Sequence, residues 1–192
     1  MDGFDIVGAC LSLICTFLFV RGSIFAWHLS AIAIPFDAFV YFKSQLFGDM
    51  MLQLLYFISA FYGWFQWRFG GGKGEALEVT SLSVAEWQKL IVLLALAVAI
   101  ILPILKPFNR GDIATIDALT TVLSLGGQWL LCRKKIETWL FWFVVDSLYI
   151  YLYAVKSLPF HSIMAAIYLT MAIAGWRKWR VELPSEPLLK TG

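Results

Sequence analysis

The side chains best suited to chemistry lie in one apolar stretch, Trp139–Tyr153. If this stretch is a helix, with 100° of rotation per residue, Trp139, Trp142, Asp146 and Tyr149 fall within an arc of about 80°. Aromatic rings around a single carboxylate suit a flat cationic or hydrogen-bonding heterocycle, through stacking and cation–π contact. The spacing therefore predicts a binding stripe for such a ring, with Asp146 as its anion.

A second polar stripe lies in the stretch before it. Asp117, Thr121, Ser124 and Gln128 are spaced to share one helix face. Small polar residues in apolar helices more often join helices than bind ligands, so we expect Thr121 and Ser124 to serve in packing. Gln128 is the member of this stripe expected to reach a ligand.

Two further polar residues are candidates for ligand contact. Gln53 is equally suited to a ligand and to an interhelical hydrogen bond. Asp37 follows Pro35, which can kink a helix, so its carboxylate is expected to face a cavity or its mouth. His28 and His161 lie near the ends of apolar stretches, and neither is assigned a role.

The composition excludes a water-soluble protein. Of 192 residues, 60% are hydrophobic, 17% aromatic and 15% charged, whereas soluble domains are about 45–50% apolar and about 25% charged. A cytosolic enzyme or a nucleic-acid-binding protein of this size could not bury so much apolar surface. Disorder is excluded as well, because it requires low hydrophobicity. The chain is therefore expected to be a polytopic membrane protein in contact with the lipid bilayer.

Seven apolar stretches are the predicted transmembrane helices. The longest connection between them, Arg68–Lys89, contains three consecutive glycines and is interpreted as a flexible linker. The acidic N-terminal sequence is unlike a signal peptide, so the first stretch is expected to be retained. The seven stretches are approximately Ile6–Val20, Ile24–Tyr41, Met50–Trp67, Leu90–Leu105, Ile116–Leu131, Trp139–Tyr153 and Phe160–Trp176.

The basic residues predict the orientation, because cytoplasmic loops carry an excess of Lys and Arg. With seven spans, one side of the membrane receives Lys43, Lys106, Arg110 and Lys156. The other side receives the remaining eleven of the fifteen basic residues. We therefore expect the N-terminus outside and the C-terminus in the cytoplasm.

The sequence contains an internal repeat with an offset of 112 residues. GWFQWR at 63–68 returns as GWRKWR at 175–180, and the same offset pairs Trp27 with Trp139 and Arg21 with Arg133. Shared Leu or Ala between apolar helices would be coincidence, but matching Trp and Arg at one offset are not. We interpret the two GWxxWR ends as anchors at the cytoplasmic interface.

The repeat predicts an all-α architecture in which seven transmembrane helices are arranged 3+1+3. Residues 1–68 form the first three-helix repeat, 69–111 a linker with the fourth helix, 112–181 the second repeat and 182–192 a cytoplasmic tail. The single extra helix makes the two repeats parallel. Parallel repeats occur in transporters, whose substrate sites lie near the membrane midplane between the repeats.

Motifs for enzymatic chemistry are absent from the sequence. It has no phosphate-binding loop, no HExxH zinc motif, no GxSxG elbow and no CxxC pair. We therefore expect no catalytic residues, no cofactor and no bound metal, and an ATP-driven pump would need a separate subunit.

Taken together, the motifs resemble the PnuC family of bacterial vitamin transporters. The likeness rests on YGWFQW at 62–67, DALTT at 117–121 and WxxWxxxD at Trp139, Trp142 and Asp146, and it covers nearly the whole chain. It implies a SWEET-like fold and facilitated uptake of nicotinamide riboside across the bacterial inner membrane, with trapping by a cytoplasmic kinase. It also implies that the three motif residues line the substrate site with Gln53 and Gln128. A homo-oligomer is implied too, with a trimer as one candidate.

Two departures from the family pattern leave the vitamin open. Transporters of nicotinamide riboside often have Asn where this chain has Asp146, and another Asn near the position of Ala33. Close relatives transport thiamine and others riboflavin. Nicotinamide riboside and thiamine both contain a cationic aromatic ring, so the Asp146 carboxylate suits both, whereas riboflavin is neutral.

Two other classes of protein are less consistent with the sequence. An integral-membrane enzyme acting on lipids or isoprenoids would need clustered acids, bases or metal ligands at an interface, and the chain offers scattered aspartates. A non-catalytic membrane scaffold would not explain Asp146 beside two indole rings.

Overall fold

The computed structural model describes residues 3–43, 47–72, 75–105, 112–155 and 159–184, and this part of the chain forms seven α-helices and no β-strand. Each predicted stretch corresponds to one helix, which confirms the seven-helix prediction. The helices run in chain order as α1 (Gly3–Val20), α2 (Phe25–Lys43), α3 (Phe47–Phe69), α4 (Val84–Leu105), α5 (Asp112–Cys132), α6 (Thr138–Val155) and α7 (Pro159–Glu182).

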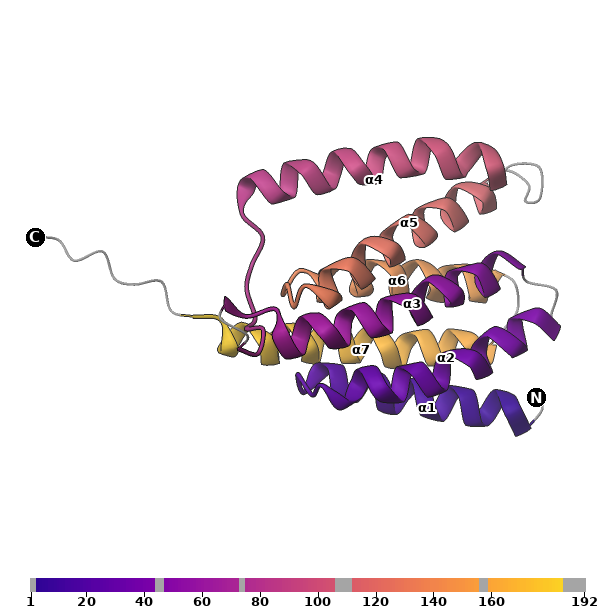
Figure 1. Ribbon diagram of the computed structural model, residues 1–192. Helices are drawn as coiled ribbons and strands as arrows, with labels where there is room; N and C mark the ends of the chain where they lie inside the picture. The colour runs from indigo at the N-terminus through magenta and orange to yellow at the C-terminus, as the bar shows by residue number, and fades with distance from the viewer. Residues whose placement is uncertain (1–2, 44–46, 73–74, 106–111, 156–158, 185–192) are drawn as a thin grey trace, which may run out of the picture.

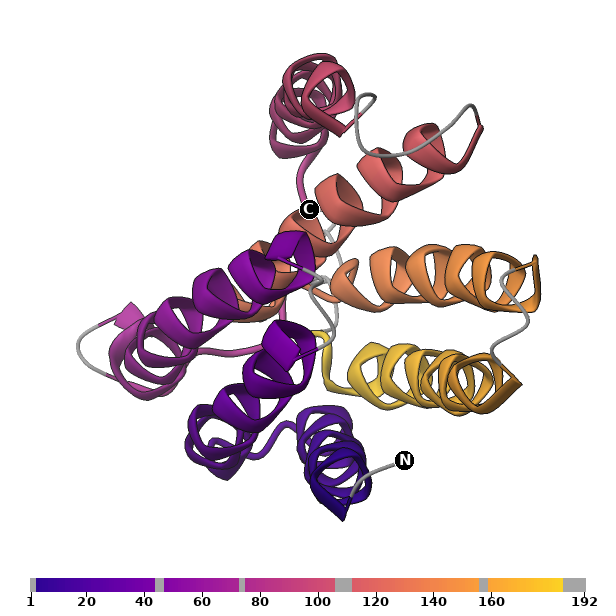
Figure 2. The same ribbon diagram turned by 90° about the vertical axis from the view of Figure 1, so that its right-hand side faces the viewer.

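Six of these helices form a closed ring. α1 packs against α2 and α7, α3 packs against α2 and α5, and α6 packs against α5 and α7. Figure 2 shows this ring roughly end-on. α4 packs mainly against α5, with Trp87 also stacking on Phe141 of α6, so it lies outside the ring (Figure 1).

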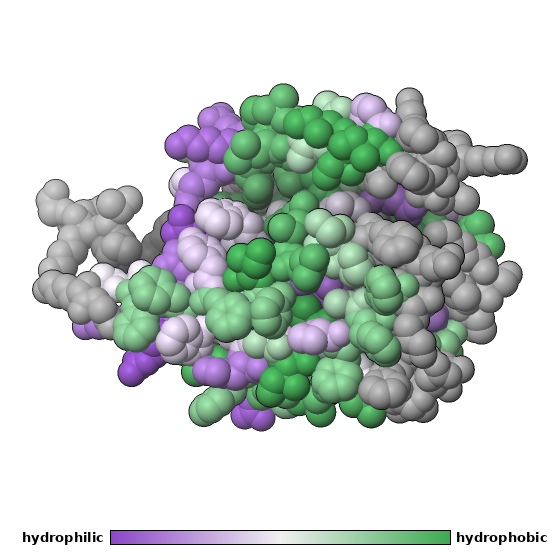
Figure 3. Space-filling model, turned by 45° about the vertical axis from the view of Figure 1, so that its right-hand side comes forward, coloured by the Kyte–Doolittle hydropathy of each residue, from purple (hydrophilic) through white to green (hydrophobic). Residues whose placement is uncertain are grey.

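The outer surface of the bundle is apolar. Large hydrophobic side chains such as Ile58, Ile91 and Ile163 are more than half exposed, and Figure 3 shows a hydrophobic band across the middle of one face. By length and composition, α4 and α6 could each cross a membrane, over Val84–Ile104 and Thr138–Val155. The remaining ring helices are more polar or have shorter apolar stretches, as expected for helices that face a polar interior.

At one end of the ring, four tryptophans form a buried cluster. The ring centroids of Trp27 and Trp67 are 5.5 Å apart, those of Trp67 and Trp179 5.8 Å, and those of Trp139 and Trp179 5.2 Å. All four side chains are at most 3% exposed. Trp67 Nε1 also donates a hydrogen bond of 2.9 Å to Leu131 O, which joins α3 to α5.

This cluster corrects the interpretation of the GWxxWR motifs. Trp67 and Trp179, the second tryptophan of each motif, lie in the protein core and not at a membrane interface. Only the first tryptophans, Trp64 and Trp176, are half-buried at the surface. An indole packed against three other aromatic rings gains more burial than it would at the interface.

Two helix turns share one geometry at the offset of the sequence repeat. Gly22 after α1 and Lys134 after α5 both have positive φ, 66° and 54°. The N–H of Ser23 donates to Leu18 O, and the N–H of Lys135 donates to Leu130 O, each over 3.0 Å. These equivalent caps, 112 residues apart, support the predicted repeat.

The prediction of a flexible linker is wrong for residues 75–83, which we call the strap. Ile136 N–H donates to Thr80 O over 2.9 Å, and Leu82 N–H donates to a Glu137 carboxylate oxygen over 2.8 Å. Val79 is only 3% exposed in the same core cluster as the tryptophans. The strap therefore packs across the end of the bundle, and α4 begins directly after it.

Candidate functional site

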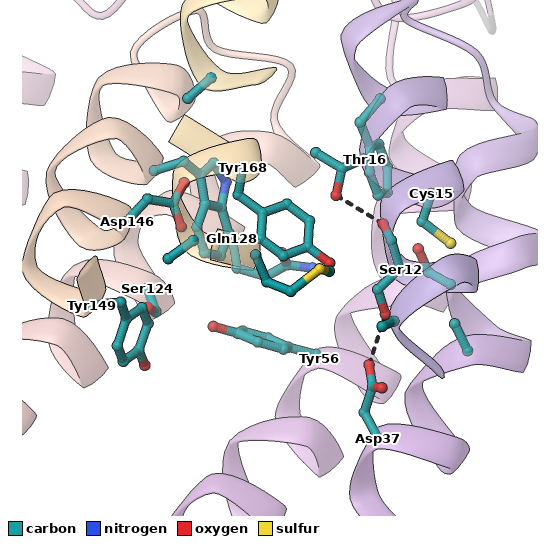
Figure 4. A pocket seen from close by; sticks show the side chains of 18 of the residues that line it. Ser12, Cys15, Thr16, Asp37, Tyr56, Ser124, Gln128, Asp146, Tyr149 and Tyr168 are labelled. Carbon is teal, nitrogen blue, oxygen red and sulfur yellow. Dashed lines mark hydrogen bonds between the residues drawn. The ribbon is translucent and has the colours of Figure 1, made fainter. Parts of the chain in front are cut away.

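A cavity of about 500 Å³ lies inside the ring of helices, and all six ring helices contribute to its walls. Its size falls within the range of about 300–1,000 Å³ typical of small-molecule sites. Figure 4 shows polar side chains directed into it from opposite walls. The cavity therefore has the size and the polar lining of a ligand site.

All seven residues predicted from the sequence as substrate contacts line this one cavity. They come from four helices: Trp139, Trp142, Asp146 and Tyr149 from α6, Gln53 from α3, Gln128 from α5 and Asp37 from α2. The structure thus brings them together, while their contact with a substrate remains a prediction.

Asp146 is the most buried acidic group of the cavity, with 7% exposure. No hydrogen bond or ion pair joins its carboxylate to another residue in the part of the chain that the structure describes. A buried carboxylate without a partner is costly in a bilayer and marks a functional site by default. The group is therefore suited to receive a cation from a ligand.

Asp37 occupies the opposite wall and has a partner. Ser12 Oγ donates a hydrogen bond of 2.8 Å to Asp37 Oδ2, and Figure 4 shows this pair facing the cavity across from Asp146. A Cβ added at Gly8 would lie 2.8 Å from Asp37 Oδ1, so the absence of a side chain there lets α1 and α2 approach. Asp37 therefore both joins two helices and contributes negative charge to the cavity.

Gln128 connects helices as well as lining the cavity. Its Nε2 donates to Ser59 Oγ over 2.7 Å, and Ser59 Oγ donates to Tyr56 O over 2.7 Å. These bonds join α5 to α3 and hold the Gln128 amide beside the cavity. The side-chain oxygen of Gln128 takes no part in these two bonds and can accept a hydrogen bond from a ligand.

Aromatic rings form much of the remaining wall. Trp142 and Tyr56 pack edge-to-face at 6.4 Å, and Tyr149 stacks on Tyr153 at 5.4 Å with an interplanar angle of 11°. Trp139 lines the cavity at its closed end, where it is only 3% exposed because it packs against Trp179. Trp142 is therefore better placed than Trp139 for stacking on a ligand.

Several cavity residues were missed by sequence reasoning. Ser124, expected to serve only in packing, lines the cavity while being 1% exposed, and His161 lines it without having been assigned a role. Asp117 and Thr121, the other members of the second polar stripe, are not among the lining residues. The cavity residues that carried no recognisable sequence signal include Ser12, Cys15, Thr16, Ser30, Tyr56 and Tyr168.

The charge of the cavity is one-sided. Asp37 and Asp146 are both in its lining, and among the described residues no Lys or Arg is. Aromatic faces and carboxylates together favour a cationic aromatic ring and disfavour an anion. No group of three His, Cys, Asp or Glu side chains that could hold a metal ion occurs among the described residues.

A polar, aromatic cavity inside a ring of helices with an apolar exterior defines a membrane transporter for small molecules. The chain belongs to the family described as nicotinamide mononucleotide transporter, whose model matches residues 3–181. The family and the relatives below are transporters, which confirms the predicted class over a membrane enzyme.

Three curated relatives cover most of this chain. The nicotinamide riboside transporter PnuC of Neisseria mucosa is 27% identical over 90% of this chain and 70% of its own length. Its counterpart from Escherichia coli is 23% identical over 91% and 84%. The riboflavin/roseoflavin transporter RibM of Streptomyces davaonensis is 26% identical over 97% and 89%.

A solved structure has the same fold. The crystal structure of the vitamin B3 transporter PnuC matches with a TM-score of 0.74 and 27% sequence identity, over 91% of this chain and 79% of that one. This match confirms the seven-helix membrane fold and the resemblance to the PnuC family.

Proposed function

We propose that this protein carries nicotinamide riboside into a bacterial cell by facilitated diffusion across the inner membrane. The observation that carries the proposal is Asp146, a buried carboxylate without a described partner, in a cavity that has aromatic walls. The pyridinium ring of nicotinamide riboside supplies the missing positive charge. The proposal also draws on the relatives named as nicotinamide riboside transporters.

Each predicted contact has a role in this proposal. Trp142 and Tyr149 stack on the pyridinium ring, Trp139 closes the deep end of the site, and Asp146 balances the charge. The amides of Gln53 and Gln128 bind the carboxamide or the ribose hydroxyls. Asp37, on the opposite wall, adds a second acceptor for hydroxyl donors.

The charge of the cavity supports the riboside over the mononucleotide named in the family description. A phosphate group carries about two negative charges near neutral pH. In this cavity it would face Asp37 and Asp146 without a lysine or arginine in the described lining. The same discrimination would make phosphorylation by a cytoplasmic kinase an effective trap, because the product could not leave through this site.

Thiamine is the second candidate, because its thiazolium ring is also a cationic aromatic ring that Asp146 could balance. Riboflavin is favoured by one observation, the similarity to RibM, which is named as a transporter of riboflavin and roseoflavin. The isoalloxazine ring of riboflavin is neutral, so it would leave Asp146 without a counter-ion. We therefore rank it below the two cations.

Calorimetric titration of the purified protein tests the proposal. We expect nicotinamide riboside to bind more tightly than thiamine, and riboflavin and nicotinamide mononucleotide to bind weakly or not at all. Asp146→Asn should weaken binding of both cations by about ten- to a hundredfold, the loss of roughly 1.4–2.7 kcal/mol. The control is Asp117→Asn, which changes a carboxylate outside the cavity lining. If nicotinamide riboside did not bind to the purified protein, the proposal would be contradicted.

We further propose that transport proceeds by rocking of the two three-helix repeats, with the N-terminus outside and the C-terminus in the cytoplasm. The described basic residues support this orientation, since Arg21, Arg68, Arg133 and Arg177 lie at or beside the end of the bundle that holds the tryptophan cluster. We call this end the basic end. A homo-oligomer, with a trimer as one candidate, completes the proposal and is tested by the mass of the detergent-solubilised protein.

A further inference from the structure

The strap, residues 75–83, connects the two halves of the ring at the basic end. Leu77 N–H donates to Trp67 O of α3 over 3.1 Å, while Thr80 N–H donates to Lys134 O over 3.2 Å in the α5–α6 turn. Lys135 Nζ donates to Ser81 O over 3.0 Å. The strap is therefore hydrogen-bonded to both halves of the chain, to α3 at Leu77 and to the α5–α6 turn at Thr80 and Ser81.

The strap also packs against the residue cluster that closes the cavity at the basic end. Phe19, Leu131 and Trp139 line the cavity and belong to the core cluster that includes Trp67 and Trp179. Val79 of the strap is buried in this same cluster. A ligand leaving through the basic end would have to pass between these residues, so the cluster and the strap must separate first.

Lys134 occupies a position that its backbone disfavours. Its φ of 54° lies in the left-handed region, which residues with a Cβ atom avoid and glycine does not. The equivalent turn after α1 has Gly22 at this position, 112 residues earlier. A lysine in the turn after α5 therefore indicates that contacts of its side chain offset the backbone cost.

The side chain of Lys134 fastens the strap. Its Nζ donates to Leu77 O over 2.8 Å and lies 4.9 Å from the ring centroid of Trp67. Burial lowers the pKa of this ammonium below its ordinary value, and Glu182 and Glu78 act in the opposite direction. Burying the ammonium is thus unfavourable by itself, and its contacts with Leu77 and Trp67 offset that cost.

The turn after α1 has no such fastening. In the described part of the chain, its backbone hydrogen bonds go only to α1 and to the start of α2. Of the two equivalent turns, the strap therefore binds only the α5–α6 turn, which holds Lys134 and lies beside Trp67 of the first half.

We propose that the strap is a clasp that holds the basic end of the transporter closed, and that Lys134 is the residue that fastens it. This inference rests on the proposed function as a transporter that opens at this end, but not on the identity of the vitamin. Release of Lys134 from Leu77 O and Trp67 frees the strap and allows the tryptophan cluster to part.

The native Cys15 provides a test that needs no vitamin, because it lines the cavity and is 5% exposed. In a Cys10→Ser, Cys132→Ser background, a membrane-impermeant methanethiosulfonate reagent is applied to the basic side of oriented vesicles. Lys134→Gly removes the fastening while relieving the backbone conformation. It should raise the rate of Cys15 labelling about tenfold from this side, by shifting the closed–open equilibrium. Labelling from the other side should not increase, because the two sides open alternately in the proposed mechanism.

Two further variants make the test specific. Arg133→Ala removes a positive charge from the same turn without removing a described contact to the strap, and it should label at the original rate. Thr80→Pro removes the N–H that donates to Lys134 O, and it should increase labelling as Lys134→Gly does. Melting temperatures in detergent identify any variant that fails to fold.

The clasp is overturned if Lys134→Gly and Thr80→Pro fold and label Cys15 at the original rate, or if Arg133→Ala accelerates labelling equally. Hydrogen exchange gives a second readout, since the amides of Thr80 and Leu82 should exchange faster in Lys134→Gly. Faster labelling in a protein that binds none of the vitamins would support the clasp and contradict the substrate assignment.

Discussion

Asp146 and Asp37 show how two carboxylates in one cavity can differ in their roles. Asp37 accepts a hydrogen bond from Ser12 and joins α1 to α2, so part of its burial cost is offset within the protein. Asp146 has no such partner among the described residues and depends on a ligand for compensation. The unpaired carboxylate is therefore the one that we expect to select a cationic ring.

Trp142 and Trp179 provide the first prediction, because they separate binding from stability. Trp142→Ala should raise the Kd for nicotinamide riboside about tenfold, since it removes a stacking and cation–π partner worth about 1–2 kcal/mol. Trp142 is only half-buried, so the melting temperature in detergent should change little.

The matched comparison is Trp179→Ala. Its side chain is fully buried in the tryptophan cluster, so truncation should cost about 3–5 kcal/mol of stability. If Trp142→Ala instead lowered the melting temperature as much as Trp179→Ala while leaving the Kd unchanged, Trp142 would be a packing residue only.

Some residues of the site could be predicted from the sequence and others could not. The α6 stripe was predictable because its aromatic and acidic residues follow the helical period. Ser12, Thr16 and Tyr168 were not, because single small or aromatic side chains in apolar helices usually serve packing. Only the closure of the ring brings residues of α1 and α7 to the same cavity as those of α6.

At the scale of helices, two glycines determine how closely α3 and α7 approach their neighbours. A Cβ at Gly63 would lie 2.4 Å from the Trp27 ring, and a Cβ at Gly175 would lie 2.4 Å from the Trp139 ring. These tryptophans are almost fully buried and cannot move aside. The absence of a side chain is therefore a packing requirement at both positions.

Gly175→Ala provides the second prediction. The added methyl group should destabilise the protein by about 1–3 kcal/mol through overpacking, more than the gain in helix propensity returns. Thermal unfolding in detergent measures this. Gly72→Ala is the control, because a Cβ there would meet nothing within 4 Å. Equal melting temperatures for the two variants would contradict the packing account.

The helices themselves were largely predictable, whereas their connections were not. Apolar stretches of sufficient length gave all seven helices, but α4 begins at Val84 and not near Leu90. Ser83 and Glu86 exchange hydrogen bonds in a capping box that starts this helix early. The strap could not be predicted, because its pairing joins Thr80 to residues more than fifty positions away, and the adjacent glycines suggested flexibility.

At the scale of the whole molecule, orientation in the membrane provides the third prediction. In a background without native cysteines, Lys178→Cys at the basic end should be labelled by an impermeant maleimide only from the cytoplasmic side. Val155→Cys, an exposed position at the opposite end of α6, should be labelled only from outside. The excess of Lys and Arg at the basic end is the physical reason. Labelling with the opposite sidedness would reverse the proposed orientation.

The molecule as a whole combines an apolar exterior, a cavity between its two halves and a sealed basic end. The composition indicated the exterior, and the motif spacing indicated one wall of the cavity. The seal required tertiary contacts, because Trp67 and Trp179 look like interfacial residues until the four indoles are brought together. A carrier with one end closed by a packed cluster is consistent with alternating access.

Uptake of labelled nicotinamide riboside into proteoliposomes tests the central claim most directly. The purified protein should equilibrate nicotinamide riboside across the membrane without an ion gradient, Asp146→Asn should slow this uptake by at least about tenfold, and Asp117→Asn should not. Uptake at the same rate in Asp146→Asn, or no uptake by the unmodified protein above that of empty liposomes, would contradict the account.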